Sequence, residues 1–228
     1  MVNNITDVFF DLDHTLWDFD RNSALAFERL FERHDIGVEL VDFIEVYEPI
    51  NFNYWKLYRE DRVSKQDLRR GRFRDAFDVF GVEFSVDELD AMAVTYIDEL
   101  PKDNHLLDGA WEVLEYLSPN YQLHIITNGF AEVQALKLKN SRIAHFFETV
   151  TSSEEVGLKK PHPVIFETAL DKASVKPDRS IMIGDTFEAD ILGAEKVGMN
   201  TLFFNYRNDN VPETYKIVKQ LTEIKLHL

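Results

Sequence analysis

Four short apolar runs along the chain each stop abruptly at polar residues. The first run, Ile5 to Phe10, ends at Asp11 and Asp13. The other three are Leu123 to Ile126 before Thr127-Asn128-Gly129, Ile181 to Ile183 before Gly184-Asp185, and Thr201 to Phe204 before Asn205. Short continuous apolar runs are typical of strands that are buried on both faces of a parallel sheet. The pattern predicts four such strands, each with polar residues at its carboxyl end.

Between these runs the apolar spacing changes to that of helices. The helical stripes are Ala110, Val113, Leu114 and Leu117, and then Ile165, Phe166, Ala169, Leu170 and Ala173. Asn128-Gly129 alone would favour a hairpin, but residues 131–139 have a helical pattern, so we reject the hairpin. Strands that alternate with helices predict an α/β fold, a Rossmann-like parallel sheet with helices on both faces.

Residues 17–97 break this alternation, because they contain several helical patterns and no convincing strand. We therefore expect an all-helical domain, residues 17–97, inserted after the first strand. The α/β core would then comprise residues 1–16 and 98–228. No glycine- or serine-rich linker separates the two parts, and we expect hinges near residues 17–20 and 100–104.

Composition narrows the possible partners and the possible metal chemistry. The chain has 228 residues and a formal charge of −16, so its field repels polymeric nucleic acid and anionic membranes. Cysteine is absent, which excludes disulfides and thiolate metal sites. The first 13 residues lack a basic start, and no segment reaches the roughly 20 apolar residues of a membrane span. We expect a cytoplasmic protein that binds neither nucleic acid polymers nor membranes.

The candidate chemistry lies at the carboxyl ends of the predicted strands, where open parallel sheets bind ligands. Asp11 and Asp13 are two residues apart, so on extended backbone their side chains leave the same face, about 7 Å apart. Asp185 would reach the same crevice from another strand. A cluster of carboxylates without thiolates or a histidine group favours magnesium, which prefers oxygen ligands.

These residues also suit phosphoryl transfer. Asp11 could attack phosphorus, and Asp13 could give a proton to the leaving oxygen and later take one from water. Thr127 could donate a hydrogen bond to a phosphoryl oxygen, and Lys160 could offset its charge. Taken singly, each residue also has an ordinary interpretation: a chance Asp-x-Asp string, a helix cap at Thr127, a surface lysine, and a turn at Gly184-Asp185.

Together, the residues resemble the haloacid dehalogenase-like hydrolase superfamily over nearly the whole chain. Its four ordered motifs correspond to Asp11-Leu12-Asp13-His14-Thr15, Thr127-Asn128-Gly129, Lys160-Pro161 and Gly184-Asp185 through Asp190. The resemblance implies that Asp11 is the nucleophile, that Asp13 is the general acid/base, and that Asp11, Asp185 and the main-chain carbonyl of Asp13 bind Mg²⁺. It also implies phosphoryl contacts from Thr127, Asn128 and Lys160, of which Lys160 is preferred over Lys159 because it directly precedes Pro161. Asp190 would support the metal site indirectly, without binding the metal itself.

Within the superfamily, the helical insert resembles a cap that closes over the substrate. Several shorter segments resemble, more narrowly, the pyrimidine 5′-nucleotidase branch, which removes phosphate from nucleoside monophosphates. The segments are Asp13 to Asp20, Gly71-Arg72-Phe73, Ile126 to Phe130 and Ser153 to Gly157. The expected partner is a small phosphorylated metabolite, first of all a nucleotide, and the expected protein is a monomer or a weak homodimer.

Other functions remain open at this stage. A sugar-phosphate or phosphoglycolate phosphatase is the nearest alternative, and a phosphomutase, a haloacid dehalogenase or a catalytically silent binding module are more distant ones. A dehalogenase would have no use for Asp13, because halide leaves without a proton. Arg72 lies in the arginine-rich segment 69–74, which could contact substrate or could pair with Asp67, Asp75 and Asp78 on a solvated helix.

Overall fold

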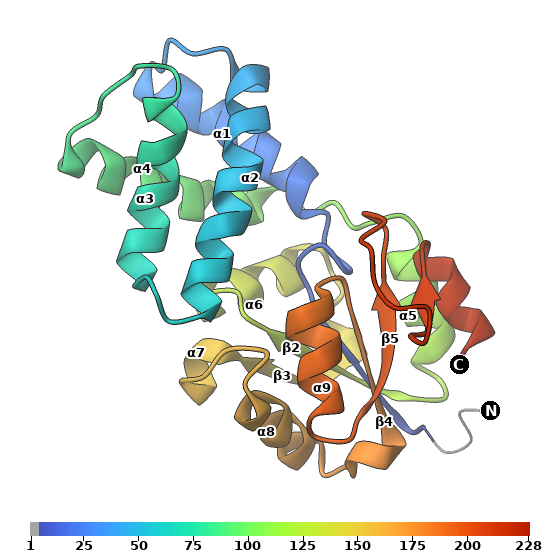
Figure 1. Ribbon diagram of the computed structural model, residues 1–228. Helices are drawn as coiled ribbons and strands as arrows, with labels where there is room; N and C mark the ends of the chain where they lie inside the picture. Colours follow the sequence, from blue (N-terminus) through green and yellow to red (C-terminus); the bar gives the residue numbers. More distant parts are fainter. Residues whose placement is uncertain (1–4) are drawn as a thin grey trace. The chain divides into compact units, whose positions relative to one another are not determined.

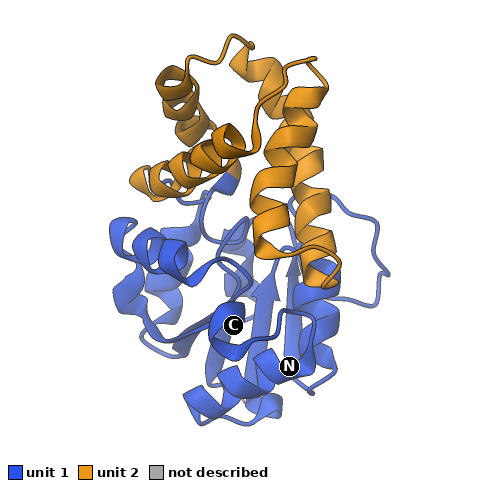
Figure 2. Cartoon of the chain, turned by 90° about the vertical axis from the view of Figure 1, so that its left-hand side faces the viewer, with its two compact units in different colours: residues 1–19, 104–228 blue, residues 20–103 orange. Residues whose placement is uncertain are grey.

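The computed structural model describes residues 5–228, and the chain divides into two compact units (Figure 2). Unit 1 comprises residues 1–19 and 104–228, and unit 2 comprises residues 20–103. The boundaries lie three and six residues further along the chain than the sequence pattern suggests. Residues 1–4, which belong to the expected core segment 1–16, lie outside the described residues. That the helical unit acts as a cap stays a prediction.

Unit 1 is built on a parallel sheet of six strands in the order β3-β2-β1-β4-β5-β6 (Figure 1). The strands are β1 Asp7–Phe10, β2 Gln122–Thr127, β3 Phe147–Ser152, β4 Ser180–Gly184, β5 Asn200–Phe204 and β6 Ile217–Val218. The four strands that the apolar runs predicted are β1, β2, β4 and β5. Because β1 pairs in parallel with both β2 and β4, the residues that follow these three strands lie together at the carboxyl ends of the strands.

Helices cover both faces of this sheet. The α-helices of unit 1 are α5 Ala110–Leu117, α6 Ala131–Asn140, α7 Ser153–Val156, α8 Pro163–Ala173 and α9 Leu192–Glu195, with a π-helical turn η4 Phe187–Ile191 before α9. Short 3₁₀ helices are η2 Ala144–Phe146, η3 Pro177–Arg179 and η5 Leu221–Leu226. Phe9 and Met182 pack with residues of α8 and α9, which lie in front of the sheet in Figure 1. Val8 and Phe10 point to the opposite face and are also fully buried, so both faces are covered, as the continuous apolar runs predicted.

Unit 2 is helical. Its helices are α1 Phe19–His34, α2 Leu40–Arg59, α3 Lys65–Asp78 and α4 Val86–Glu99, followed by the 3₁₀ helix η1 Leu100–Lys102. Capping boxes begin α3 at Ser64 and α4 at Ser85, where each serine hydroxyl accepts from the third helical residue. Inside, Phe27 packs against the rings of Phe43 and Tyr96, at centroid distances of 5.1 and 4.8 Å. These observations confirm the α/β core with an inserted all-helical segment.

Two strands at opposite edges of the sheet were not expected from the sequence. In β3 the residues Phe147 to Val150 are exposed or only partly buried, so their polar and apolar residues mix and no apolar run forms. The strand β6 has only two residues, too few for a pattern. Among the described residues no helix is long and apolar enough to cross a membrane.

Candidate active site

Asp11 lies directly after β1, where its backbone N–H continues the sheet by donating to the carbonyl of Ile183 at 3.0 Å. Its side chain is largely buried. The pKa of Asp11 is raised to about 7, mainly by burial, with Asp190 adding to the shift and Lys160 opposing it. The pKa of Asp11 is therefore raised because its carboxylate is removed from water, although a cation already contacts it.

That cation is Lys160, which is fully enclosed at the end of a loop that follows α7. Its Nζ lies 2.7 Å from Oδ1 of Asp11, from Oδ1 of Asp190 and from the carbonyl of Ile126. Burial alone would lower the pKa of Lys160, but Asp11 and Asp190 hold it above the ordinary value. The lysine is thus a permanent cation between two carboxylates, as its place in the predicted site requires.

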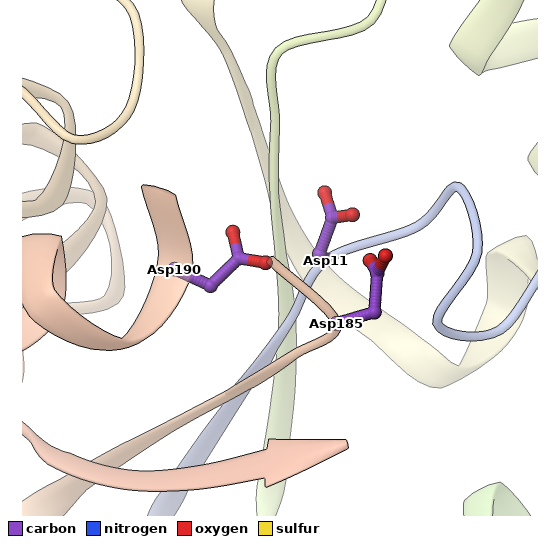
Figure 3. Close-up of side chains that lie close together, drawn as sticks. All are labelled: Asp11, Asp185 and Asp190. Carbon is purple, nitrogen blue, oxygen red and sulfur yellow. The ribbon is translucent and has the colours of Figure 1, made fainter. Parts of the chain in front are cut away.

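Asp11, Asp185 and Asp190 form an acidic cluster, whose carboxylates are drawn in Figure 3. One oxygen from each lies within 4.8 Å of the others. Asp185 follows β4, and burial together with Asp11 and Asp190 raises its pKa well above the ordinary value. Asp190 accepts from the backbone N–H of Thr186 at 3.0 Å, which fixes it in the η4 turn.

The donor set of this cluster fits a divalent cation. All three groups are oxygen ligands, and they come close enough to share one ion. Burial, with the neighbouring carboxylates adding to it, raises the pKa values of Asp11 and Asp185, so a bound cation would favour their charged forms. Lys160 contacts one oxygen of Asp11 and one oxygen of Asp190 at the same distance, 2.7 Å, so its contacts do not separate these two carboxylates as metal ligands. The role that the resemblance implied for Asp190, support of the metal site, stays a prediction.

Asp13, the expected acid/base, lies beside this cluster and is held by two residues of α6. Lys137 donates to its Oδ1 at 2.5 Å, and Gln134 donates to its Oδ2 at 3.0 Å. Lys137 also lies over the ring of Trp17, 4.0 Å from the centroid. Sequence reasoning assigned no role to Gln134 or Lys137. The available signal was their place on the inner side of the predicted helix, next to Val133 and Leu138.

Thr127 ends β2, and its buried hydroxyl accepts hydrogen bonds from Gln134 Nε2 at 2.7 Å and from the N–H of Gly129 at 3.0 Å. Asn128 has a different position from the one expected. Its side-chain amide is paired with the main chain of Lys160, donating to the carbonyl at 3.0 Å and accepting from the N–H at 2.8 Å. The Asn128 side chain therefore anchors the main chain of Lys160. A contact between Asn128 and substrate would then come from the backbone of Asn128.

Two further residues contact Asp185, and a third, His14, contacts one of them. Thr15 donates to its Oδ1 at 3.1 Å, and Arg207 donates to its Oδ2 at 3.3 Å. Arg207 also lies 2.7 Å from Nδ1 of His14, whose pKa is lowered well below the ordinary value by burial and by Arg207 and Lys137. His14 is thus a neutral ring that faces two cations. Arg207 had no motif around it and was not predicted.

Arg72, expected to contact substrate, lies in the interior of unit 2. It is 1% exposed, donates to Oδ1 of Asn51 at 2.9 Å, and lies 4.9 Å from the ring centroid of Tyr96. The rings of Tyr47 and Phe73 are also within 5.8 Å. The alternative of a solvated helix does not describe Arg72, because the guanidinium is enclosed by aromatic rings. The substrate contact of Arg72 stays a prediction.

Its neighbours in the arginine-rich segment make carboxylate pairs on the surface. Arg74 lies 2.7 Å from Asp75, as the ion-pair alternative proposed, while Arg70 pairs with Asp90 of α4 at 2.6 Å. The arginine cluster is therefore mostly neutralised within unit 2, and the sequence could not separate the buried Arg72 from its exposed neighbours.

The fold and the site together define an α/β enzyme with a buried aspartate-lysine pair and a carboxylate cluster at one edge of a parallel sheet. Residues 8–204 match the haloacid dehalogenase-like hydrolase family. The chain belongs to this family, and the expectation of a hydrolase is confirmed.

Comparisons with individual proteins agree with this assignment. Pyrimidine 5′-nucleotidase YjjG from Escherichia coli (strain K12) is 33% identical over 90% of this chain and 88% of its own. A glyceraldehyde 3-phosphate phosphatase from Methanothermobacter thermautotrophicus is 43% identical over 87% of this chain and 84% of its own. A crystal structure of the HAD-hydrolase YfnB from Bacillus subtilis bound to magnesium has a TM-score of 0.90 and 26% identity, with 99% of both chains covered. The recognition of the family from its four motifs is thereby confirmed.

Proposed function

We propose that the protein is a magnesium-dependent phosphatase that hydrolyses nucleoside 5′-monophosphates through an aspartyl phosphate on Asp11. The observation that carries this proposal is the buried Asp11 carboxylate, 2.7 Å from the ammonium of Lys160, with the separately held Asp13 two residues along the chain. One aspartate is thus held beside a cation, as suits a nucleophile for a phosphoryl group, and a second lies nearby to move protons.

In the first step a carboxylate oxygen of Asp11 attacks phosphorus, and the bond from phosphorus to the ester oxygen breaks. Asp13 gives its proton to that oxygen, so the nucleoside leaves as an alcohol. Lys160 and the hydroxyl of Thr127 bind the phosphoryl oxygens, on which negative charge gathers. Asp11 is left as an acyl phosphate.

In the second step water attacks the phosphorus of the aspartyl phosphate. Asp13, now a carboxylate, takes a proton from this water, and the bond between phosphorus and the Asp11 oxygen breaks. Inorganic phosphate leaves, and Asp11 and Asp13 return to their starting protonation states. The carboxylate of Asp190 helps to hold Lys160 in its charged form, so a positive charge stays beside the phosphoryl group through both steps.

Asp11 and Asp185, with the main-chain carbonyl of Asp13, would hold the magnesium ion, and Asp190 would support the site through Lys160. When bound, magnesium would neutralise charge on the carboxylates and on the transferring phosphoryl group. The close approach of the Asp11 and Asp185 carboxylates supports this assignment, as does the magnesium-bound structure of a related hydrolase.

The nucleotide substrate rests on the similarity to pyrimidine 5′-nucleotidase YjjG and on the segments that resemble its branch. A specific observation also supports a second candidate, a sugar-phosphate phosphatase, because a glyceraldehyde 3-phosphate phosphatase is 43% identical to this chain. Both candidates use the same residues of unit 1, and they differ in the leaving alcohol.

The test is phosphate release from a panel of pyrimidine and purine 5′-monophosphates and of triose and sugar phosphates, with magnesium and with a chelator. Asp11→Asn is the control, since it keeps the shape of the side chain and removes the nucleophilic oxygen. Magnesium-dependent release that favours pyrimidine nucleotides and disappears in Asp11→Asn is expected. A preference for sugar phosphates would select the second candidate, and release that persists in Asp11→Asn would overturn the mechanism.

A further inference from the structure

Gln134, in the first turns of α6, contacts two residues of the proposed reaction with one amide group. Its Nε2 donates to Oδ2 of Asp13 at 3.0 Å and to Oγ1 of Thr127 at 2.7 Å. The side chain is 1% exposed, so these bonds form away from water. An amide nitrogen has two hydrogens, and both are accounted for by these two acceptors.

The contact with Thr127 determines the direction of the threonine hydroxyl. A hydroxyl oxygen accepts two hydrogen bonds and donates one. Here Oγ1 of Thr127 accepts from Gln134 and from the N–H of Gly129 at 3.0 Å. With both acceptor positions taken, the hydroxyl can act toward a ligand only as a donor. A phosphoryl oxygen needs such a donor.

The contact with Asp13 fixes the orientation of the carboxylate. Gln134 holds Oδ2 from one side, while the ammonium of Lys137 holds Oδ1 at 2.5 Å. A carboxylate bound at both oxygens cannot rotate freely about its Cβ–Cγ bond. Proton transfer to a leaving oxygen depends on such fixed geometry, since a misplacement of 1 Å can cost roughly 100-fold in rate.

The backbone leaves room for this amide at Gly129. A Cβ atom built there would lie 2.2 Å from Nε2 of Gln134, which no side chain could tolerate without displacing the amide. The glycine after Asn128 is therefore matched to Gln134, five residues further on.

We propose that Gln134 is a positioning residue for phosphoryl transfer, which orients the acid/base Asp13 and fixes the hydroxyl of Thr127 as a donor to the phosphoryl group. This inference rests on the proposed phosphatase function. It assigns to Gln134 no contact with the reacting atoms, so the residue acts through Asp13 and Thr127.

Two substitutions test this role. Gln134→Met keeps the length of the side chain and removes its donors. Gln134→Glu places an acceptor against the Asp13 carboxylate and draws the Thr127 hydrogen toward itself. We expect kcat on a nucleoside monophosphate to fall about 100-fold in Gln134→Met and further in Gln134→Glu. Gln122→Glu, the same change at an exposed position at the start of β2, is the matched control and should keep wild-type kcat.

The decisive readout is the dependence on the leaving group. With p-nitrophenyl phosphate, whose leaving group departs without a proton, mispositioning of Asp13 matters less. The comparison uses kcat/KM, which reports phosphoryl transfer to Asp11 and not the later hydrolysis of the aspartyl phosphate that both esters share. The loss of kcat/KM in Gln134→Met should therefore be at least about tenfold smaller on this ester than on the nucleotide. Equal losses on both esters would overturn the positioning role, as would a Gln134→Met enzyme with wild-type kcat. The melting temperature of each variant is measured to show that it folds. If Gln134→Glu does not fold, the result for Gln134→Met decides the test. Wild-type inactivity on every phosphate ester would instead refute the proposed function, a result distinct from failure of the inference.

Discussion

The ammonium of Lys160 donates a 2.7 Å hydrogen bond to the carboxylate of Asp11, although 149 positions separate the two residues in the chain. The same nitrogen lies 2.7 Å from Asp190, so one buried cation serves two buried carboxylates. Since burial of a charge is costly unless it is paired, each member of this group depends on the others. Substitution of the lysine should therefore affect folding as well as chemistry.

We expect Lys160→Met to lower the free energy of unfolding at neutral pH by about 3 kcal/mol, because it leaves Asp11 and Asp190 without their shared cation. Phosphatase activity should fall by at least about 100-fold, since a charge beside the phosphoryl group is lost. Urea denaturation and kcat/KM measure the two effects. The control is Lys159→Met, the adjacent lysine, which should change both quantities little. Equal effects of the two substitutions would contradict the assignment of Lys160.

The sequence was enough to predict the parts of the fold in which neighbouring residues determine the pattern. The runs that became β1, β2, β4 and β5 are buried throughout almost their whole length, so apolarity alone identified them. The strand β3 was not predicted because an edge strand mixes exposed and buried residues. Its pairing with β2 joins segments that are far apart in the chain, so a short stretch of sequence does not show it.

The same distinction applies to the site. Asp11, Asp185 and Lys160 stand next to strand ends or in short motifs, and their convergence followed from parallel strand topology. Gln134 and Lys137 could not be found in this way, because their role depends on which face of α6 meets Asp13. The burial of Arg72 could not be predicted for a similar reason: a run of arginines on a helix does not reveal which member points inward.

The enclosed position of Arg72 changes what its substitution should do. Arg72→Ala removes the bond to Asn51 and leaves a gap among the rings of Tyr47 and Tyr96. We expect a loss of about 3 kcal/mol in the free energy of unfolding. The KM for nucleotides and for aryl phosphates should change by the same factor. Chemical denaturation and substrate kinetics provide the measurements.

Arg70→Ala is the matched control for this substitution. Arg70 pairs with Asp90 on the surface of unit 2, where an ion pair contributes less than about 1 kcal/mol. A selective rise of the nucleotide KM in Arg72→Ala, with unchanged stability, would restore the substrate contact that the sequence suggested.

The raised pKa values in the acidic cluster predict how the stabilisation of the fold by magnesium depends on pH. Burial raises the pKa of Asp11 to about 7 and that of Asp185 well above its usual range. A carboxyl group whose pKa is higher in the folded state stabilises the fold below the unfolded pKa near 3.8, and this contribution disappears as pH rises through 7. In the metal-free protein, Asp11 alone should therefore lower stability by up to about 1.4 kcal/mol per pH unit in that window.

Bound magnesium would neutralise these carboxylates, so it should stabilise the protein more at pH 8 than at pH 5.5. Melting temperatures with magnesium chloride and with a chelator, measured across this range, give the difference. Burial lowers the pKa of His124, so its protonation at acidic pH also reduces the stability of the fold. His124 contacts Asp7 and Thr149 and no residue of the acidic cluster, so this effect should be similar with and without magnesium. A magnesium effect that does not grow with pH would argue against the carboxylate site.

Gly129→Ala offers a way to disturb Gln134 without changing it. The new methyl group would lie 2.2 Å from Nε2 of Gln134, so the amide must move away from Asp13 and Thr127. We expect kcat on a nucleoside monophosphate to fall about 100-fold, with a smaller loss on p-nitrophenyl phosphate, as in Gln134→Met. Gly37→Ala, at a position where a Cβ atom meets nothing within 4 Å, is the control and should leave activity unchanged. In the double variant Gly129→Ala with Gln134→Met, the two losses should not add, because both act on the same hydrogen bonds. Additive losses would mean that Gly129 and Gln134 act independently, and the link between them would have to be abandoned.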